Sequence, residues 1–69
     1  MHEYDVKLHF KIIGLWWAEY AIPAECTDGA KDNALAKLIN KAGYEFVQDV
    51  DCVRVYKRNT NRLLKEYNI

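Results

Sequence analysis

The stretch Glu3-Tyr-Asp-Val-Lys-Leu-His-Phe-Lys-Ile12 decides the fold, because apolar and polar residues alternate along it without a break. Successive side chains of a β-strand point to opposite faces, so this segment is predicted to be a strand with one buried and one solvated face. The buried set is Tyr4, Val6, Leu8, Phe10 and Ile12, and the solvated set is Glu3, Asp5, Lys7, His9 and Lys11.

The composition predicts one small folded domain over residues 1–69. Hydrophobic residues make up 51% of the chain and aromatic residues 13%, which argues against disorder. Ten basic and ten acidic residues give a formal net charge of zero. This balance argues against a strongly basic nucleic-acid binder, although a local charged patch can still form. It is also compatible with a homodimer, since no net charge opposes self-association.

The chain shows no sign of export or membrane insertion. Its N-terminus is polar, and no apolar run approaches the roughly 18 residues of a membrane span. Cys26 and Cys52 match no zinc or redox spacing, and two cysteines do not make a disulfide framework. We therefore expect reduced, half-buried thiols in a cytoplasmic protein with no membrane contact.

A second strand is expected over 16–26, after a turn at Gly14. Its even positions, from Trp16 to Ala24, are expected to face inward, which places Trp17 on the solvated face. Opposed residues of an antiparallel pair share a face, so a two-residue loop conflicts with this pattern. An odd loop or a bulge is required, and a three-residue loop would oppose Phe10 to Ala18. Pro23 cannot donate a ladder hydrogen bond and predicts an edge strand.

The rest of the chain predicts a helix and a second hairpin. Apolar positions between Ala34 and Ala42 have helical spacing, Thr27 or Asp28 can cap the start and Gly43 the end, so a helix is expected over about 28–42. Residues 44–49 are predicted to be a loop or an extended entry to a strand over 50–58. A turn at 59–61 follows. The tail 62–69 fits either a strand or a helical turn, and the short turn favours a strand.

These elements predict an α+β fold of ββαββ order, with one helix on one face of an antiparallel sheet ordered 2-1-3-4. No nucleophile–base pair is evident, because neither His2 nor His9 has a serine or cysteine in a local catalytic pattern. A metal site is not expected either, because Lys7 separates Asp5 from His9 on their shared face and repels a cation. No Gly-rich phosphate loop is present either. We therefore expect no enzyme activity, no cofactor and no metal, and hold an enzyme subunit completing another protein's site as a third hypothesis.

The uncovered face of the sheet is the candidate partner-binding surface. Cations interleaved with aromatic rings suit a protein interface, and they also suit single-stranded nucleic acid, while an ordinary solvated face remains a third interpretation. A second, basic patch is expected near the last hairpin, either functional or simply solvated. The residues expected on the sheet face are Lys7, His9, Lys11, Trp17, Arg54 and Tyr56, and those of the basic patch are Lys57, Arg58, Arg62 and Lys65.

One pattern over most of the chain joins four segments: the opening Tyr-x-Val-x-Leu-x-Phe strand, the Ile22-Pro-Ala-Glu25 hairpin end, the short Ala-rich helix and the closing Val53-Arg-Val-Tyr56 segment. This pattern resembles small phage- or mobile-element-encoded α+β proteins, among them certain anti-CRISPR proteins. The resemblance implies a protein that binds and blocks a host complex. We thus expect a non-enzymatic protein-binding module, with a small nucleic-acid-binding protein as the alternative.

Overall fold

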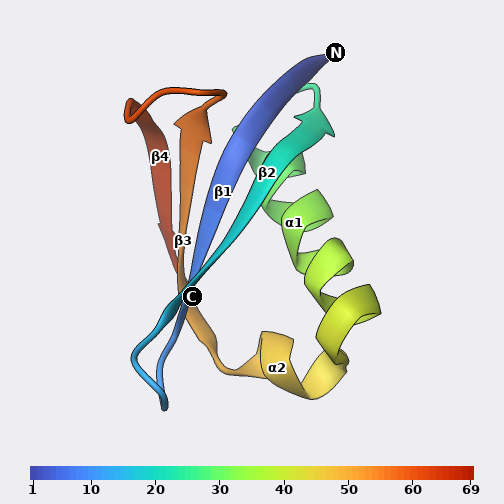
Figure 1. Ribbon diagram of the computed structural model, residues 1–69, viewed down its shortest axis with the longest axis vertical. Coiled ribbons are helices and arrows are strands. Elements are labelled where there is room, and N and C mark those ends of the chain that lie inside the picture. The colour runs from blue at the N-terminus through green and yellow to red at the C-terminus, as the bar shows by residue number, and fades with distance from the viewer.

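The computed structural model describes residues 1–69 as a four-stranded sheet with a long and a short helix (Figure 1). All strand pairs are antiparallel, and their order is β2-β1-β3-β4. The predicted α+β class and strand order are confirmed. The elements are β1 (His2–Phe10), β2 (Trp16–Ala24), α1 (Thr27–Ala42), α2 (Tyr44–Gln48), β3 (Val50–Lys57) and β4 (Leu63–Asn68).

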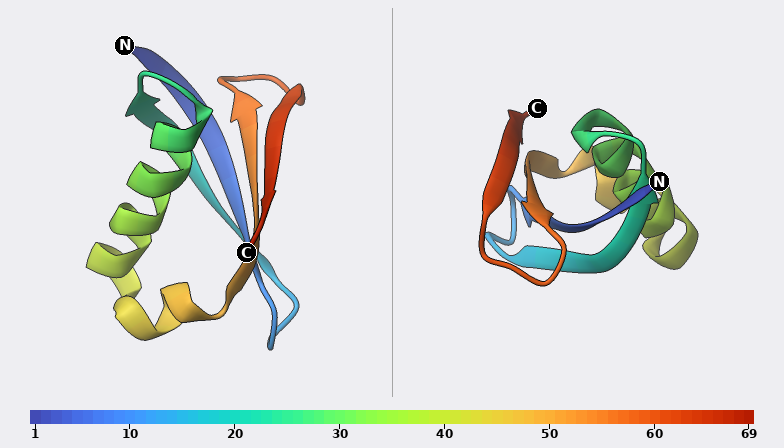
Figure 2. Two further views of the ribbon diagram at one scale, coloured as in Figure 1. Left: turned by 180° about the vertical axis from the view of Figure 1, so that it is seen from behind. Right: turned by 90° about the horizontal axis from the view of Figure 1, so that it is seen from above.

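Helix α1 covers one face of the sheet and leaves the other uncovered (Figure 2). The core lies between α1 and the sheet. Its fully buried residues come from three of the strands and from one stripe of the helix. These residues are Val6, Leu8, Ile22, Val53, Val55, Ala30, Ala34 and Leu38. Strand β1 lies between β2 and β3, inside the sheet, as the predicted strand order requires. Neither helix is long and apolar enough to cross a membrane.

The β1–β2 hairpin differs from its prediction in length and register. Strand β1 ends at Phe10, because the Lys11 N–H donates to the Asp49 carbonyl at 2.9 Å and the Ile12 N–H to the Asp49 carboxylate at 3.3 Å. The predicted burial of Ile12 is therefore wrong, and its side chain is 84% exposed. Residues 11–15 form a five-residue loop. Trp16 therefore pairs with His9, and not with Ile12 as a three-residue loop would require.

A β-bulge then reverses the side-chain pattern of β2. The register shifts between Tyr4 and Val6 of β1, and Ala21 in the facing strand takes the left-handed φ of 56°. An extra residue in one strand changes which face the following residues occupy. After the bulge Ile22 faces the core as predicted; before it, the predicted faces are inverted.

The inversion corrects the assignment of the tryptophans. Trp17 opposes Leu8 on the helix side, and Trp16 opposes His9 on the uncovered face. The prediction that Trp17 lies on the uncovered face is therefore wrong, as is the predicted inward direction of Trp16, Ala18 and Tyr20. The parity argument that the two rings take opposite faces still holds.

The helical region also departs from expectation at its ends. Helix α1 has Cys26 at its N-cap position with no side-chain cap, and the Thr27 hydroxyl instead accepts a bond from Tyr67 of β4 at 3.0 Å. Gly43 ends the helix with φ 95°, as predicted. Residues 44–48 form the helix α2, not the predicted loop or strand entry. The Phe46 ring packs edge-on against the Phe10 ring, with centroids 6.0 Å apart.

The C-terminal segment forms a strand, as the short turn at 59–61 predicted. The Thr60 amide donates to the Lys57 carbonyl at 3.1 Å, and Asn59 takes φ 61° within the turn. Strand β4 then pairs with β3 from Cys52↔Asn68 to Tyr56↔Leu63. Strand β2, with Pro23, lies at the opposite edge of the sheet.

Candidate binding face

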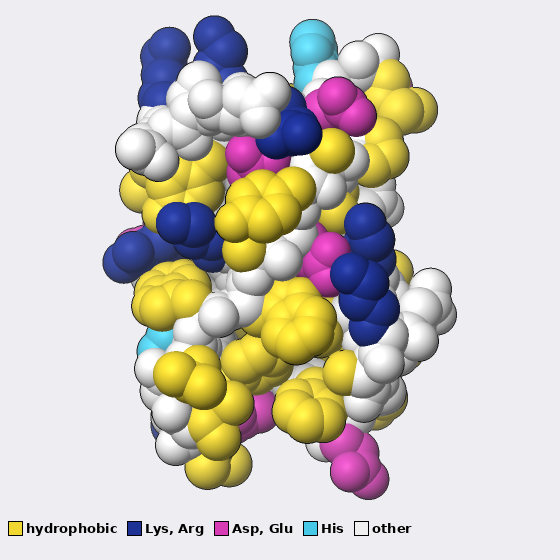
Figure 3. Space-filling view, viewed as in Figure 1, with side chains coloured by type: hydrophobic (Ala, Val, Ile, Leu, Met, Phe, Trp, Pro, Cys, Tyr) yellow, Lys and Arg dark blue, Asp and Glu magenta, His cyan; other side chains and the backbone are white.

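The uncovered side of the sheet, here called the open face, is an aromatic and cationic surface. Cross-strand pairing places its residues side by side: Lys7 lies between Ala18 and Arg54, and His9 between Trp16 and Cys52. Figure 3 views this side and shows apolar side chains gathered over it, with cations among them. The residues that form the open face are Lys7, His9, Trp16, Ala18, Tyr20, Cys52, Arg54 and Tyr56.

Trp16 lies between two cross-strand neighbours. Its ring is tilted against His9 with centroids 4.8 Å apart, and the Arg54 guanidinium lies 4.7 Å from the Trp16 ring centroid. Arg54 also donates to Glu66 of β4 at 2.5 Å, and this bond lowers the pKa of the Glu66 carboxyl. The ring is therefore positioned by its neighbours while 44% of the residue surface remains exposed.

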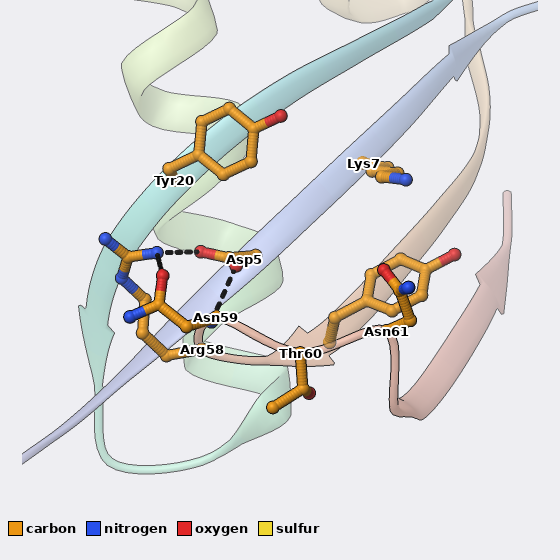
Figure 4. A pocket seen from close by; sticks show the side chains of 8 residues that line it. Asp5, Lys7, Tyr20, Arg58, Asn59, Thr60 and Asn61 are labelled. Atoms are coloured by element: carbon orange, nitrogen blue, oxygen red, sulfur yellow. Dashed lines mark hydrogen bonds and ion pairs between the residues drawn. The ribbon is translucent and has the colours of Figure 1, made fainter.

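Lys7 forms the centre of the open face. Its ammonium group lies 5.1 Å from the Tyr56 ring centroid, a cation–π contact, and it makes no ion pair with a carboxylate. Between Lys7, Tyr20 and the β3–β4 turn the surface is hollowed (Figure 4). The Lys7 ammonium group thus lies beside an aromatic ring and has no carboxylate partner.

Asp5 lines this hollow beside Arg58 and Asn59. Its carboxylate accepts the Ala21 N–H at 3.2 Å, the Asn59 N–H at 3.0 Å and the Arg58 guanidinium at 3.3 Å, the last two drawn in Figure 4. Ala21 and Asn59 are the two non-glycine residues with positive φ. One carboxylate therefore stabilises both left-handed positions, and joins the β2 bulge to the β3–β4 turn.

A separate apolar surface lies at the tip of the β1–β2 hairpin. Ile12, Ile13 and Leu15 are all exposed in the loop that leads into Trp16. Large aliphatic side chains that are mostly exposed and grouped at a turn are typical of an interaction surface. This tip continues into the open face through Trp16.

Of the residues predicted for the sheet face, the structure brings four together there: Lys7, His9, Arg54 and Tyr56. Lys11 lies outside, in the exposed β1–β2 loop.

Trp17 lies at the edge of the helix side, where it contributes to a cluster around the buried Glu19 carboxylate. Its indole N–H donates to Glu19 at 2.9 Å, and Glu19, only 3% exposed, also accepts from Lys41 of α1 at 3.0 Å. Burial raises the pKa of the Glu19 carboxyl, but the bonds from Trp17 and Lys41 and the charges of Lys41 and Lys37 outweigh it and lower the pKa overall.

The predicted basic patch is not one surface. Arg58 turns toward Asp5, at 3.3 Å. The Lys65 ammonium group instead lies 5.3 Å from the Tyr67 ring centroid, on the side of Val55, and Lys57 pairs with buried Tyr4 on that same side. Arg62 lies exposed at the end of the turn. A strand separates neighbouring side chains onto two faces, so clustering in sequence does not give clustering in space.

One constellation on the open face contains the residue types of nucleophilic catalysis. The His9 Nδ1 atom lies 2.7 Å from the Asp51 carboxylate, and Cys52 is the cross-strand partner of His9. Burial of the thiol together with the nearby Glu66 charge, however, raises the pKa of Cys52. Both effects favour the neutral thiol, whereas a nucleophilic cysteine needs the thiolate.

Three open-face residues escaped sequence reasoning: Trp16, Ala18 and Tyr20. All three were assigned to the core because even positions of β1 and β2 share apolar character. The sequence favours this wrong assignment, because a charged residue such as Glu19 is expected to face solvent, whereas Glu19 is the residue that turns inward.

Comparison with protein-family models, with curated proteins and with solved structures finds no match.

Proposed function

We propose that this chain is a non-enzymatic protein-binding module that docks a partner on the open face. The observation that carries the proposal is Trp16, an exposed aromatic ring held in place between His9 and Arg54 and continuous with the apolar hairpin tip. Tryptophan, tyrosine and arginine dominate the binding energy of protein interfaces, and a ring already fixed by its neighbours loses little entropy on binding.

The charges of the open face favour a protein over nucleic acid. Nucleic-acid binding needs several cations free to contact phosphates. Arg54 is neutralised by Glu66 and Arg58 by Asp5, and Asp51 adds a further carboxylate next to His9. Lys7 alone remains without a carboxylate partner on this face. Repulsion from these acids would offset much of the attraction that a phosphate backbone gains from one lysine.

The resemblance to phage-encoded inhibitors supplies the finer form of the proposal, in which the partner is a component of a host defence complex. A blocking protein needs only a stable surface complementary to its target and no reactive group. The small fold, the rigid sheet and the fixed Trp16 ring are compatible with such a role.

The proposal is tested by capture with matched variants. The affinity-tagged protein is incubated with lysate of its natural host, with and without nuclease, beside Trp16→Ala and Leu64→Ala. Leu64 is an exposed leucine of β4, away from the hairpin tip. We expect a protein captured by the parent and by Leu64→Ala, lost with Trp16→Ala and insensitive to nuclease. Capture that survives Trp16→Ala, or that nuclease removes, would contradict the proposal.

A further inference from the structure

The open face is hollowed along its length. One hollow of about 740 Å³ lies beneath the β3–β4 turn, and a second of about 360 Å³ lies beside Trp16 and Arg54. Lys7, Tyr20 and Tyr56 line both, so the two hollows adjoin, and together they are here called the trough. Sites of a few hundred Å³ accept ligands the size of a short peptide segment.

The walls of the trough are aromatic. Tyr20 on β2 and Tyr56 on β3 flank the central strand β1, and strands two positions apart in a sheet lie roughly 9–10 Å from each other. Figure 4 shows Tyr20 and Lys7 on different sides of the hollow, with the turn residues Thr60 and Asn61 along another. A side chain of an incoming segment can lie between the two tyrosines, above β1.

The charge of the trough is positive although the chain as a whole is neutral. Lys7, Arg54 and Arg58 line it, but Arg54 pairs with Glu66 and Arg58 with Asp5, so Lys7 is the cation without a carboxylate partner. Asp5 is 8% exposed and already accepts three hydrogen bonds, so it has little capacity left for a ligand. A negatively charged group therefore complements this surface.

We propose that the trough takes an extended acidic segment of a partner protein. One of its carboxylates faces Lys7 and the exposed edge of Arg58, and a neighbouring side chain packs between Tyr20 and Tyr56. The inference rests on the protein-binding function proposed above, and specifies which chemistry the partner presents at this end of the open face. The apolar hairpin tip and Trp16 contact a separate, apolar part of the same partner.

The test is a selection of random dodecapeptides displayed on phage, with the whole protein as bait at low salt. We expect enrichment of peptides that carry Asp or Glu next to an aromatic or planar side chain. A synthetic peptide of the enriched sequence should bind the parent, and lose about tenfold or more in affinity with Lys7→Glu and with Tyr20→Ala. Lys11→Glu is the matched control: it places the same charge change on the exposed β1–β2 loop, and it should change affinity less than about twofold.

Folding is controlled by melting curves and by Lys7→Gln, which removes the charge without adding an opposite one. Lys7→Gln should weaken peptide binding in the same direction as Lys7→Glu. Enriched peptides that lack acidic residues, or that bind equally to Lys7→Gln and to Lys11→Glu, would overturn the inference. So would a poly-dT oligonucleotide or a second copy of this chain occupying the trough in place of the peptide. Peptides that depend on Trp16 but not on Lys7 would refute this inference and leave the proposed function standing.

Discussion

Replacing Asp5 by alanine should destabilise the domain more than any other single change of an acidic residue. The substitution removes the acceptor for the Ala21 amide, the Asn59 amide and Arg58, at 3.2, 3.0 and 3.3 Å. It also removes the contacts that hold Ala21 and Asn59 at positive φ. We therefore expect the β2 bulge and the β3–β4 turn to loosen together, although they lie at different strands of the sheet.

The magnitude follows from the hydrogen bonds. A bond to a charged group contributes about 1.5–3 kcal/mol when it is well shielded. Arg58 is about one-third exposed, and the two amides can bond to water once the carboxylate is gone, so the total is about 3 kcal/mol rather than the full sum. A domain of this size loses about 4–8 °C in melting temperature for each kcal/mol, which predicts a fall of roughly 12–24 °C.

Thermal and urea unfolding followed by circular dichroism measure this loss, with Glu3→Ala as the control. Glu3 lies two residues away on β1, is exposed and makes no ion pair, so its removal should stay within about 0.5 kcal/mol of the parent. Hydrogen exchange should show faster exchange of the Ala21 and Asn59 amides in Asp5→Ala. Equal melting temperatures for Asp5→Ala and Glu3→Ala would refute the role given to this carboxylate.

Three substitutions and one thiol-reactivity measurement test the remaining features. Ala21→Gly should raise the free energy of unfolding by up to about 1 kcal/mol in urea titrations, because glycine adopts φ 56° without strain; a loss would mean that the bulge is not strained. Leu8→Ala should lower it by about 2–5 kcal/mol, since Leu8 is fully buried in the central strand, and a parent-like melting curve would contradict that position. The folded-state pKa of Glu19 is lowered, so its stabilising contribution is present above the unfolded-state pKa and is lost as the pH falls through the folded-state value. Glu19→Gln should thus flatten the loss of stability in acid, and an unchanged acid transition would count against the cluster. Exposed Cys26 should react with a thiol reagent in the native protein faster than half-buried Cys52, and equal rates would contradict their placement.

Much of the sheet could be predicted because apolar and polar residues alternate strictly along β1. A central antiparallel strand with one face on a helix must alternate, and Tyr4 to Phe10 do so. The crossover rule then placed β3 beside β1, and Pro23 placed β2 at the edge. These inferences depend on period and on chirality, which a single sequence carries.

The face assignment of β2 could not be predicted because it depends on a contact distant in sequence. An alanine gives no signal for positive φ, and its left-handed conformation at Ala21 depends on the Asp5 carboxylate, 16 residues earlier. Without that bulge, counting by twos along β2 assigned Trp16 to the core and Trp17 to the surface. The helix α2 was missed for a different reason: residues 44–49 were predicted to be a loop or an extended strand entry, and periodicity does not identify a helix of five residues.

Site-specific photo-crosslinking tests most directly the claim that the open face binds a protein. The chain offers a matched pair, because Tyr20 on the open face and Tyr44 on α2 are 60% and 62% exposed. A photoreactive phenylalanine derivative replaces each tyrosine in turn, and the protein is irradiated in its natural host. We predict a protease-sensitive, nuclease-resistant adduct from position 20 and none from position 44. An adduct from position 44 alone, or from neither position, would contradict the account.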